Sequence, residues 1–215
     1  MKDFTDILAI IDRSGSMEHI QDATEEGFNG FVRTQRETPG ECALSLYQFD
    51  NHYEVVFEDR PIAQVAPYQL VPRGTTALLD ALGRTIAARG AHYAALPEDQ
   101  RPARVVVVVV TDGRENASRE YTLGQVKELV TRQQEVYQWQ FVFLGANMDA
   151  MAEARGLGIS TDHALTFSAD EEGVAHSYRS LSLLVSSYKS QDPGTLMASF
   201  GPDDRERAGR REKRG

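Results

Sequence analysis

Cysteine is almost absent from this chain, and its scarcity excludes one class of fold. The single cysteine, Cys42, cannot form an intramolecular disulfide, so the chain is not a small disulfide-stapled domain. The sequence around it, ECALSLYQF, is typical of a buried strand, in which a free cysteine behaves as a small apolar residue. We therefore expect Cys42 to pack in the core rather than to react.

Long apolar runs are also missing. The N-terminal stretch MKDFTDILAII has no signal-peptide core, because Asp6 interrupts it. Elsewhere no apolar run reaches the length of about 18 residues that a membrane-spanning helix needs. We therefore expect no membrane segment and an intracellular, cytoplasmic protein.

An excess of positive charge is lacking as well. The chain has 32 Asp and Glu against 23 Lys and Arg, which gives a formal net charge of −9. Nucleic acids and anionic membranes attract basic patches, so this balance argues against both as partners. It leaves a metal site open, because carboxylates are metal ligands. The five histidines share no ligand spacing, and we expect them at the surface.

Length and composition suit one domain, which we place at residues 1–200 of the 215. Residues 201–215 differ in composition. The last thirteen residues contain six basic and four acidic side chains, and Ala208 is their single apolar residue. Such a segment buries too little apolar surface to offset the entropy of ordering. We therefore predict a charged, disordered C-terminal tail.

Apolar patterning predicts alternating strands and helices. The strongest signal is VVVVVV at residues 105–110, because six β-branched residues without alternation indicate a strand buried on both faces. The turn Asp50-Asn51-His52 joins two strand-like runs and predicts a hairpin. Strands are expected at 6–11, 42–49, 53–59, 105–110, 139–147 and 164–169, and helices at 18–37, 76–91, 122–137, 148–157 and 171–189.

This order of elements predicts an α/β fold. The expected architecture is a three-layer α/β/α, Rossmann-like, doubly wound arrangement with a mainly parallel six-stranded sheet and one antiparallel edge strand. In such sheets, the loops at the carboxyl ends of the central strands form the usual ligand site, especially where the strand order reverses.

Side chains with hard oxygen donors gather in three loops at the ends of these elements: Asp12, Ser14 and Ser16, then Thr75 and Thr76, then Asp112. Alternate positions in Asp-x-Ser-x-Ser allow three side chains of one curved turn to face one centre, and Gly15 permits the turn. Oxygen-only ligands favour magnesium, calcium or manganese over zinc. Because few of these donors are charged, a bound cation would keep an open position for an outside carboxylate.

Each loop alone also has a structural interpretation. Ser16 can cap the helix that begins near Glu18, and Thr-Asp-Gly after a strand is a common turn. Asp80, one helical turn beyond Thr76, is better explained as a cap or a solvated residue. Together, at the ends of the most buried strands, the three loops favour a metal site.

The same loops resemble one known family. The segments DRSGSM at residues 12–17, GTTALLDA at 74–81 and VVVVVVTDG at 105–113 are similar to the metal-ion-dependent adhesion site (MIDAS) of the von Willebrand factor A (VWA) domain family. The resemblance spans residues 5 to about 190. The stretches FNGFVRTQRE, PRGTTALLDAL and FLGANMDA look like a compact, intracellular branch found in bacteria and phages.

The resemblance implies a fold, a ligand set and a kind of partner. The family's sheet order, 3-2-1-4-5-6, places Asp12 and Asp112 beside the point where the strand order reverses. By the family pattern, Ser14, Ser16 and Thr76 would hold the cation directly, and the two acids would bind it directly or through water. The implied cofactor is Mg²⁺, with Mn²⁺ or Ca²⁺ as alternatives, completed by an Asp or Glu of a partner protein. Relatives of this kind often work beside chaperone-like ATPases, in stress responses or in phage-encoded systems.

Several polar residues near these loops are weaker candidates. Arg114, Glu115 and Asn116 follow the second acid and could form a rim that a partner touches. Asn147 and Asp149 follow the next strand and could line the same crevice, although a structural role in a turn explains them equally well.

Three functional hypotheses follow from these observations. The first is a metal-dependent protein-binding module with no catalytic residues. The second is a metal-dependent hydrolase or phosphatase, in which the cation would activate water. The third is a scaffold with a vestigial metal site. The three loops contain no histidine or lysine as a base, Ser14 is not in a G-x-S-x-G motif, and Asp12 does not begin a D-x-D motif. We therefore favour the first hypothesis and predict no enzymatic activity.

Overall fold

The computed structural model describes residues 3–209 and contains one six-stranded sheet between two layers of helices. The strands are β1 (Thr5–Asp12), β2 (Cys42–Phe49), β3 (Tyr53–Pro61), β4 (Arg104–Thr111), β5 (Gln140–Ala146) and β6 (Ala164–Phe167). The α-helices are α1 (Gln21–Glu37), α2 (Leu78–Ala95), α3 (Leu123–Tyr137), α4 (Ala150–Gly156), α5 (Glu171–Lys189) and α6 (Pro202–Ala208). A short 3-10 helix, η1 (Gly15–Ile20), leads directly into α1.

The sheet has the order β3-β2-β1-β4-β5-β6, and β2 and β3 form its antiparallel pair. This confirms the predicted mainly parallel sheet with one antiparallel edge strand. The order reverses at β1, where Ile7 lies between Leu44 of β2 and Val106 of β4. The carboxyl ends of β1 and β4 therefore lie side by side at the reversal, where ligands of open α/β sheets commonly bind.

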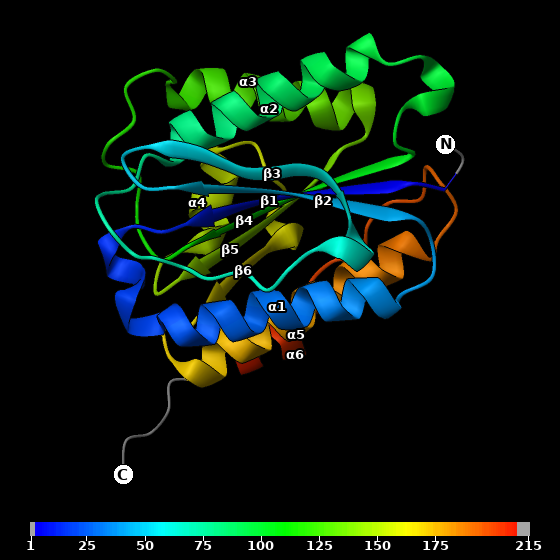
Figure 1. The fold of residues 1–215 in the computed structure, drawn as a ribbon. Helices are drawn as coiled ribbons and strands as arrows, with labels where there is room; N and C mark the ends of the chain where they lie inside the picture. The colour runs from blue at the N-terminus through cyan, green and yellow to red at the C-terminus, as the bar shows by residue number, and fades with distance from the viewer. Residues whose placement is uncertain (1–2, 210–215) are drawn as a thin grey trace.

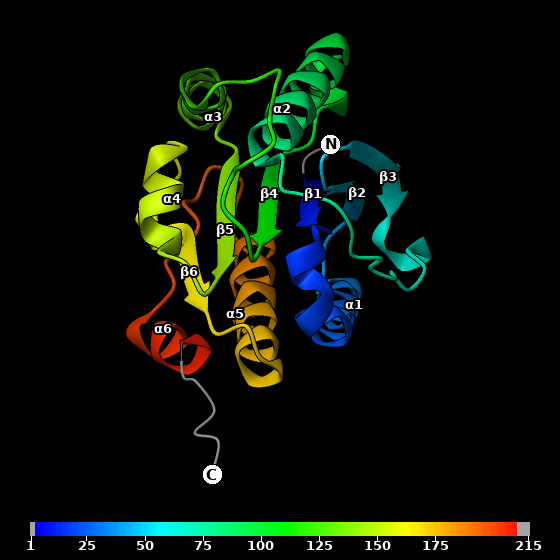
Figure 2. The ribbon, with the colours of Figure 1, turned by 90° about the vertical axis from the view of Figure 1, so that its left-hand side faces the viewer.

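Helices cover both faces of the sheet, with α2 and α3 on one face and α1 and α5 on the other (Figure 1). The view in Figure 2 shows the same three layers and places α6 beside α5 and β6. The side chains of β1 and β4 alternate between two cores. Ile7 and Val106 pack toward α1 and α5, whereas Leu8 and Val107 pack toward α2 and α3.

The double coverage explains why the central strands are apolar at every position. All eight residues of β4 are buried, so the valine run has no solvent-facing side. Burial of one valine side chain contributes roughly 1.5–3 kcal/mol, and the run therefore anchors the centre of the sheet. Cys42 is a free, buried thiol, as expected, and burial raises its pKa to about 11.

The start of α3 is fixed by a pair of local hydrogen bonds between neighbouring residues. The Thr122 hydroxyl accepts a hydrogen bond from the Gln125 backbone N–H, and Gln125 Oε1 accepts one from the Thr122 N–H at 2.9 Å. This reciprocal pair is a capping box, and it makes Thr122 the N-cap of α3, at the start of the helix predicted for residues 122–137.

The prediction of a disordered tail is wrong for residues 202–208, which form α6. The charged side chains of this helix bind buried polar groups of the domain: Asp204 accepts a 2.7 Å hydrogen bond from Ser180, and Arg205 Nη1 donates to the Ala164 carbonyl at 2.8 Å. Ala208 is fully buried, and its carbonyl accepts from the Ser168 N–H. The rest of the predicted tail, residues 210–215, lies outside the described residues. Within residues 3–209, no helix has the length and apolar content needed to cross a membrane.

Candidate metal centre

The first acid of the candidate centre, Asp12, is the last residue of β1 and is fully buried. Its Oδ1 accepts a 2.7 Å hydrogen bond from the Ser14 N–H, and its Oδ2 accepts a 2.6 Å hydrogen bond from the hydroxyl of Thr111, the last residue of β4. Asp12 therefore both closes the turn that follows β1 and joins the ends of the two central strands.

A chain of hydroxyl and carboxylate groups crosses from the β1 loop to the β4 loop. The Ser14 and Ser16 hydroxyl oxygens are 3.0 Å apart, and the Ser16 hydroxyl donates to Asp112 Oδ1 at 2.6 Å. The Asp112 side chain is only 3% exposed. The structure thus brings together four of the residues predicted as ligands: Asp12, Ser14, Ser16 and Asp112.

The fifth predicted ligand, Thr76, reaches the same place through Gly113. A Cβ atom on Gly113 would lie 2.8 Å from Thr76 Oγ1 and 3.7 Å from Ser16 Oγ, so both hydroxyls face this glycine. Asn116 holds the Thr76 backbone on both sides: its Oδ1 accepts from the Thr76 N–H, and its own N–H donates to the Thr76 carbonyl, each at 3.0 Å. Thr76 is buried, whereas its neighbour Thr75 is exposed.

Burial dominates the electrostatics of the two acids. It raises the pKa of Asp12 to about 6, against the opposing hydrogen bonds from Thr111 and Ser14. It also raises the pKa of Asp112, despite the hydrogen bond from Ser16. A divalent cation beside these carboxylates would offset the free-energy cost of keeping them ionised in a buried place.

The donor set fits a hard cation. The gathered groups are two carboxylates and three hydroxyls, and oxygen ligands of this kind suit Mg²⁺, Mn²⁺ or Ca²⁺. Within residues 3–209, no group of three or more His, Cys, Asp or Glu side chains is placed to bind a metal, so a zinc centre of nitrogen and sulfur ligands is not built there.

One neighbour of the centre was missed by the sequence reasoning. His19 in η1 is half exposed, and its Nδ1 lies 2.5 Å from the Ser16 carbonyl and 4.0 Å from Asp112 Oδ2. His19 lies three residues after Ser16, and residues at this spacing in a helical turn lie on the same side, so the spacing alone could have placed His19 near the centre.

The residues predicted for the rim differ in their surroundings. Arg114 is exposed, with its Nε 3.8 Å from Glu153 Oε1. Glu115 instead turns inward: its carboxylate accepts hydrogen bonds from the backbone N–H groups of Leu79, Ala117 and Ser118 and from the Ser118 hydroxyl. Glu115 is therefore a structural cap of α2 and its neighbouring loop, and its place in a partner-binding rim stays a prediction.

The remaining weak candidates have structural roles. Asn147 is exposed at a turn with a φ of 50°, and its Oδ1 accepts from the Ala169 N–H at 3.2 Å. Asp149 caps α4 by accepting from the Ala152 N–H. Asp80 accepts from the backbone N–H groups of three successive loop residues, Arg119, Glu120 and Tyr121.

A polar cavity of about 840 Å³ adjoins the candidate centre. Thr75 and Asn116, which flank Thr76 in the chain and in space, belong to its lining. Arg84 and Arg119 also line it. The cavity therefore begins next to the gathered oxygen donors and extends along α2.

The sequence matches no protein-family model and no curated protein. Solved structures do match. Proximal thread matrix protein 1 from the mussel byssus, with a zinc-occupied MIDAS motif, has a TM-score of 0.58 and 16% identity, over 85% of this chain and 46% of that one. A von Willebrand factor type A protein from Catenulispora acidiphila has a TM-score of 0.58 and 17% identity, over 84% and 42% of the two chains.

A third match covers nearly the whole of its own chain. The vWF domain of the type V pili tip protein Mfa5 from Porphyromonas gingivalis has a TM-score of 0.61 and 10% identity, over 91% of this chain and 99% of that one. This chain thus spans less than half of the first two proteins, but about one full domain of the third. At these identities the likeness shows the fold, and the chain has the α/β fold of von Willebrand factor type A domains.

Proposed function

We propose that this chain is a metal-ion-dependent protein-binding module with an intact MIDAS. Mg²⁺ would be held by Asp12, Ser14, Ser16, Thr76 and Asp112, and an Asp or Glu of a partner protein would complete its shell. The observation that carries the proposal is the continuous chain of oxygen donors across the ends of β1 and β4. A structural neighbour whose MIDAS motif is occupied by zinc supports a divalent ion in this fold.

The donor count explains why a partner is needed. Mg²⁺ prefers six oxygen ligands in octahedral geometry, and five side chains cannot fill that shell. Only Asp12 and Asp112 among them carry formal charge and the other three donors are neutral hydroxyls, so the ion would bind an anionic oxygen from outside more strongly than it binds water. The chain itself has a net charge of −9, and the ion would offset the charge of the two site carboxylates, so that an acidic partner can approach.

The cavity beside Thr75 gives the partner's chain a place to lie. His52, Asn116 and Arg119 line it with hydrogen-bond donors, while Asp80 on its wall already accepts three backbone N–H groups. A segment rich in acceptors, such as an extended backbone flanking the coordinating acid, suits this lining.

The local chemistry favours binding over turnover. The imidazole beside the centre, His19, has its Nδ1 against the Ser16 carbonyl. The matched structures include a matrix protein and a pilus tip protein, which agrees with a non-enzymatic role. The resemblance in the sequence further suggests a cytoplasmic bacterial or phage setting, with a chaperone-like ATPase or another stress- or phage-system component as partner.

Affinity purification tests this proposal. The immobilised chain is loaded with Mg²⁺, exposed to lysate, and eluted with EDTA. We expect a defined partner to elute, and we expect Asp12→Ala and Asp112→Ala to lose it while circular dichroism shows an intact fold. Asp22→Ala, which removes an exposed acid from α1, is the matched control and should retain the partner. Binding that survives both EDTA and the two site variants would refute the proposal.

A further inference from the structure

Asp50, at the end of β2, is a buried acid that the ligand set does not use. Its side chain is fully buried, and its Oδ2 accepts hydrogen bonds from Arg13 Nε at 2.9 Å and from Arg73 Nε at 2.7 Å. Its Oδ1 accepts from the His52 N–H at 2.6 Å. Both carboxylate oxygens are thus engaged by the protein, so Asp50 is not free to act as a metal ligand.

The two arginines belong to the loops that carry the candidate ligands. Arg13 lies between Asp12 and Ser14 in the chain, and Arg73 lies three residues before Thr76. Asp50 therefore connects, through one carboxylate, the turn after β1 with the segment before α2.

Backbone hydrogen bonds complete the same unit. The Arg13 N–H donates to the Phe49 carbonyl at 2.8 Å, and the Arg73 N–H donates to the Arg13 carbonyl at 2.7 Å. The Gly15 N–H donates to the Gly74 carbonyl at 3.1 Å, and the Ala77 N–H donates to the Asp50 carbonyl at 2.9 Å. Three loops thus form one hydrogen-bonded unit, which carries four of the five candidate ligands: Asp12, Ser14, Ser16 and Thr76.

The charge state of Asp50 suits this role. Burial alone would raise its pKa, but the hydrogen bonds from Arg73 and the His52 N–H and the charges of both arginines outweigh burial and hold the pKa below its usual value. Arg13 is further fixed by Glu54, which accepts from its Nη1 at 2.8 Å. Asp50 is therefore ionised at neutral pH, and its pairs with the arginines are charge-assisted.

We propose that Asp50 is a positioning residue of the metal centre: through Arg13 and Arg73 it fixes the turn at residues 12–16 relative to Thr76, so that their hydroxyls are preorganised for the ion. The proposal rests on the metal-binding function proposed above. Residues that orient ligands without touching the metal commonly change metal affinity by about 10–100-fold when they are removed.

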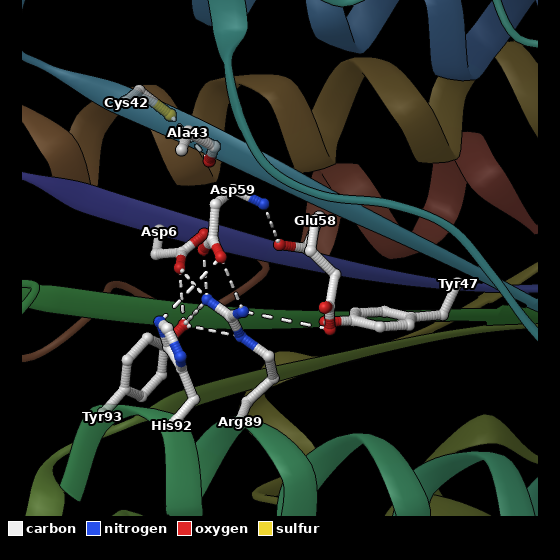
Figure 3. A network of polar contacts seen from close by, with 10 residues as sticks. Asp6, Cys42, Ala43, Tyr47, Glu58, Asp59, Arg89, His92 and Tyr93 are labelled. Atoms are coloured by element: carbon white, nitrogen blue, oxygen red, sulfur yellow. Dashed lines mark hydrogen bonds and ion pairs between the residues drawn. The ribbon is translucent and has the colours of Figure 1, made fainter. Parts of the chain in front are cut away.

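The test is Mg²⁺ titration by calorimetry on Asp50→Asn, with Asp6→Asn as the matched control. Asp6 is also a buried acid paired with a buried arginine, since it accepts from Arg89 at 2.9 Å and from the Tyr93 hydroxyl at 2.5 Å (Figure 3). It lies near the other end of β1, away from the candidate ligands. We expect Asp50→Asn to weaken Mg²⁺ binding about tenfold or more and Asp6→Asn to leave it unchanged.

Thermal melting of each variant separates positioning from stability. If Asp50 acted on stability alone, both variants would melt earlier and bind Mg²⁺ like the wild type at a temperature well below melting. That result would overturn the proposal and leave the proposed function intact. If Asp50→Asn does not fold, Arg73→Gln decides: this side chain is 57% exposed, so its loss removes one donor while the Arg13–Asp50 pair remains.

Arg73→Gln should weaken Mg²⁺ binding with little change in melting temperature, and an unchanged affinity would again overturn the positioning role. If the wild-type chain itself does not bind Mg²⁺, the proposed function fails and this inference fails with it. The wild-type titration thus distinguishes the failure of the function from the failure of the inference.

Discussion

Replacing Arg89 with methionine tests how much a buried ion pair stabilises the end of the sheet opposite the candidate metal centre. Arg89 lies on α2, is 2% exposed, and donates to Asp6 of β1 at 2.9 Å and to Asp59 of β3 at 3.0 Å (Figure 3). It also contacts the Tyr93 hydroxyl at 3.1 Å. One guanidinium therefore ties a helix to a central strand and to an edge strand.

The expected loss in unfolding free energy follows from the contacts that remain in Arg89→Met. Methionine keeps an apolar stem of similar length, so packing is largely retained. Asp6 would keep only the Tyr93 hydroxyl as a donor, because its Oδ1 has no hydrogen-bond partner within the described residues. Breaking a buried ion pair from one side costs about 3–5 kcal/mol. Such a loss is a large part of the ~5–15 kcal/mol that typically separates folded from unfolded chains.

The pH dependence of this loss has a definite sign. Burial raises the pKa of Asp6 to about 6 even though the charge of Arg89 lowers it, so removal of Arg89 raises it further. A carboxyl with a raised pKa in the folded state favours folding below its unfolded pKa, and this contribution is lost as the pH rises through the folded pKa. The deficit of Arg89→Met should therefore be smaller at pH 5 than at pH 7.5.

Urea unfolding at the two pH values measures the deficit. The matched control is Arg84→Met, which makes the same change five residues earlier on α2. Its side chain is 43% exposed and paired with the exposed Glu120, so little stability should be lost. The reasoning would be refuted if the two variants were equally stable at pH 7.5, or if the deficit of Arg89→Met grew toward pH 5.

Two further pairs of substitutions test packing. Gly173→Ala should lower the unfolding free energy by at least about 2 kcal/mol, because its Cβ would lie 2.2 Å from the Ser168 carbonyl oxygen. In Gly124→Ala in α3, the added Cβ meets nothing within 4 Å, so this variant should raise the unfolding free energy by about 0.5–1 kcal/mol. Urea unfolding that gave the two glycine variants the same stability would contradict these expectations. Ala208→Asp should lower the unfolding free energy by at least about 2 kcal/mol, because it buries an unpaired charge. Arg207→Ala, on the exposed side of α6, should be nearly neutral. Equal melting temperatures for the two variants would show that α6 contributes no stability.

Most of the fold could be predicted because its signals are local. The valine run needs no partner to be recognised as a central strand, and the 42–49 and 53–61 strands are separated by a short turn that permits only an antiparallel pairing. The tail could not be predicted from composition. Asp204 and Arg205 order α6 by binding groups more than 20 residues away, and a charge count contains no information on such pairs.

The same distinction applies to the candidate centre. The candidate ligands in the turn after β1 can be recognised from their spacing within a single segment. The parallel pairing of β1 and β4 then brings Asp112 beside them. Glu115 and Asn147 were harder to judge, because an acid or amide in a loop has the same appearance whether it faces a partner or caps a helix. Distant donors, such as the Leu79 N–H for Glu115, reveal the capping role, and no local pattern in the sequence contains them.

Three acids beside the centre clarify how its charge would be set. Asp50 is engaged by two arginines and a backbone N–H, Asp80 accepts three backbone N–H groups, and Glu115 accepts three backbone N–H groups and a hydroxyl. None of these carboxylates is available to an ion, although Asp80 and Glu115 are close in the chain to a candidate ligand and Asp50 contacts the ligand loops through Arg13 and Arg73. An ion at the centre would therefore be neutralised by Asp12 and Asp112 alone among these five acids. Under the proposed function, the last position of the ion's shell is therefore left for a carboxylate from another protein.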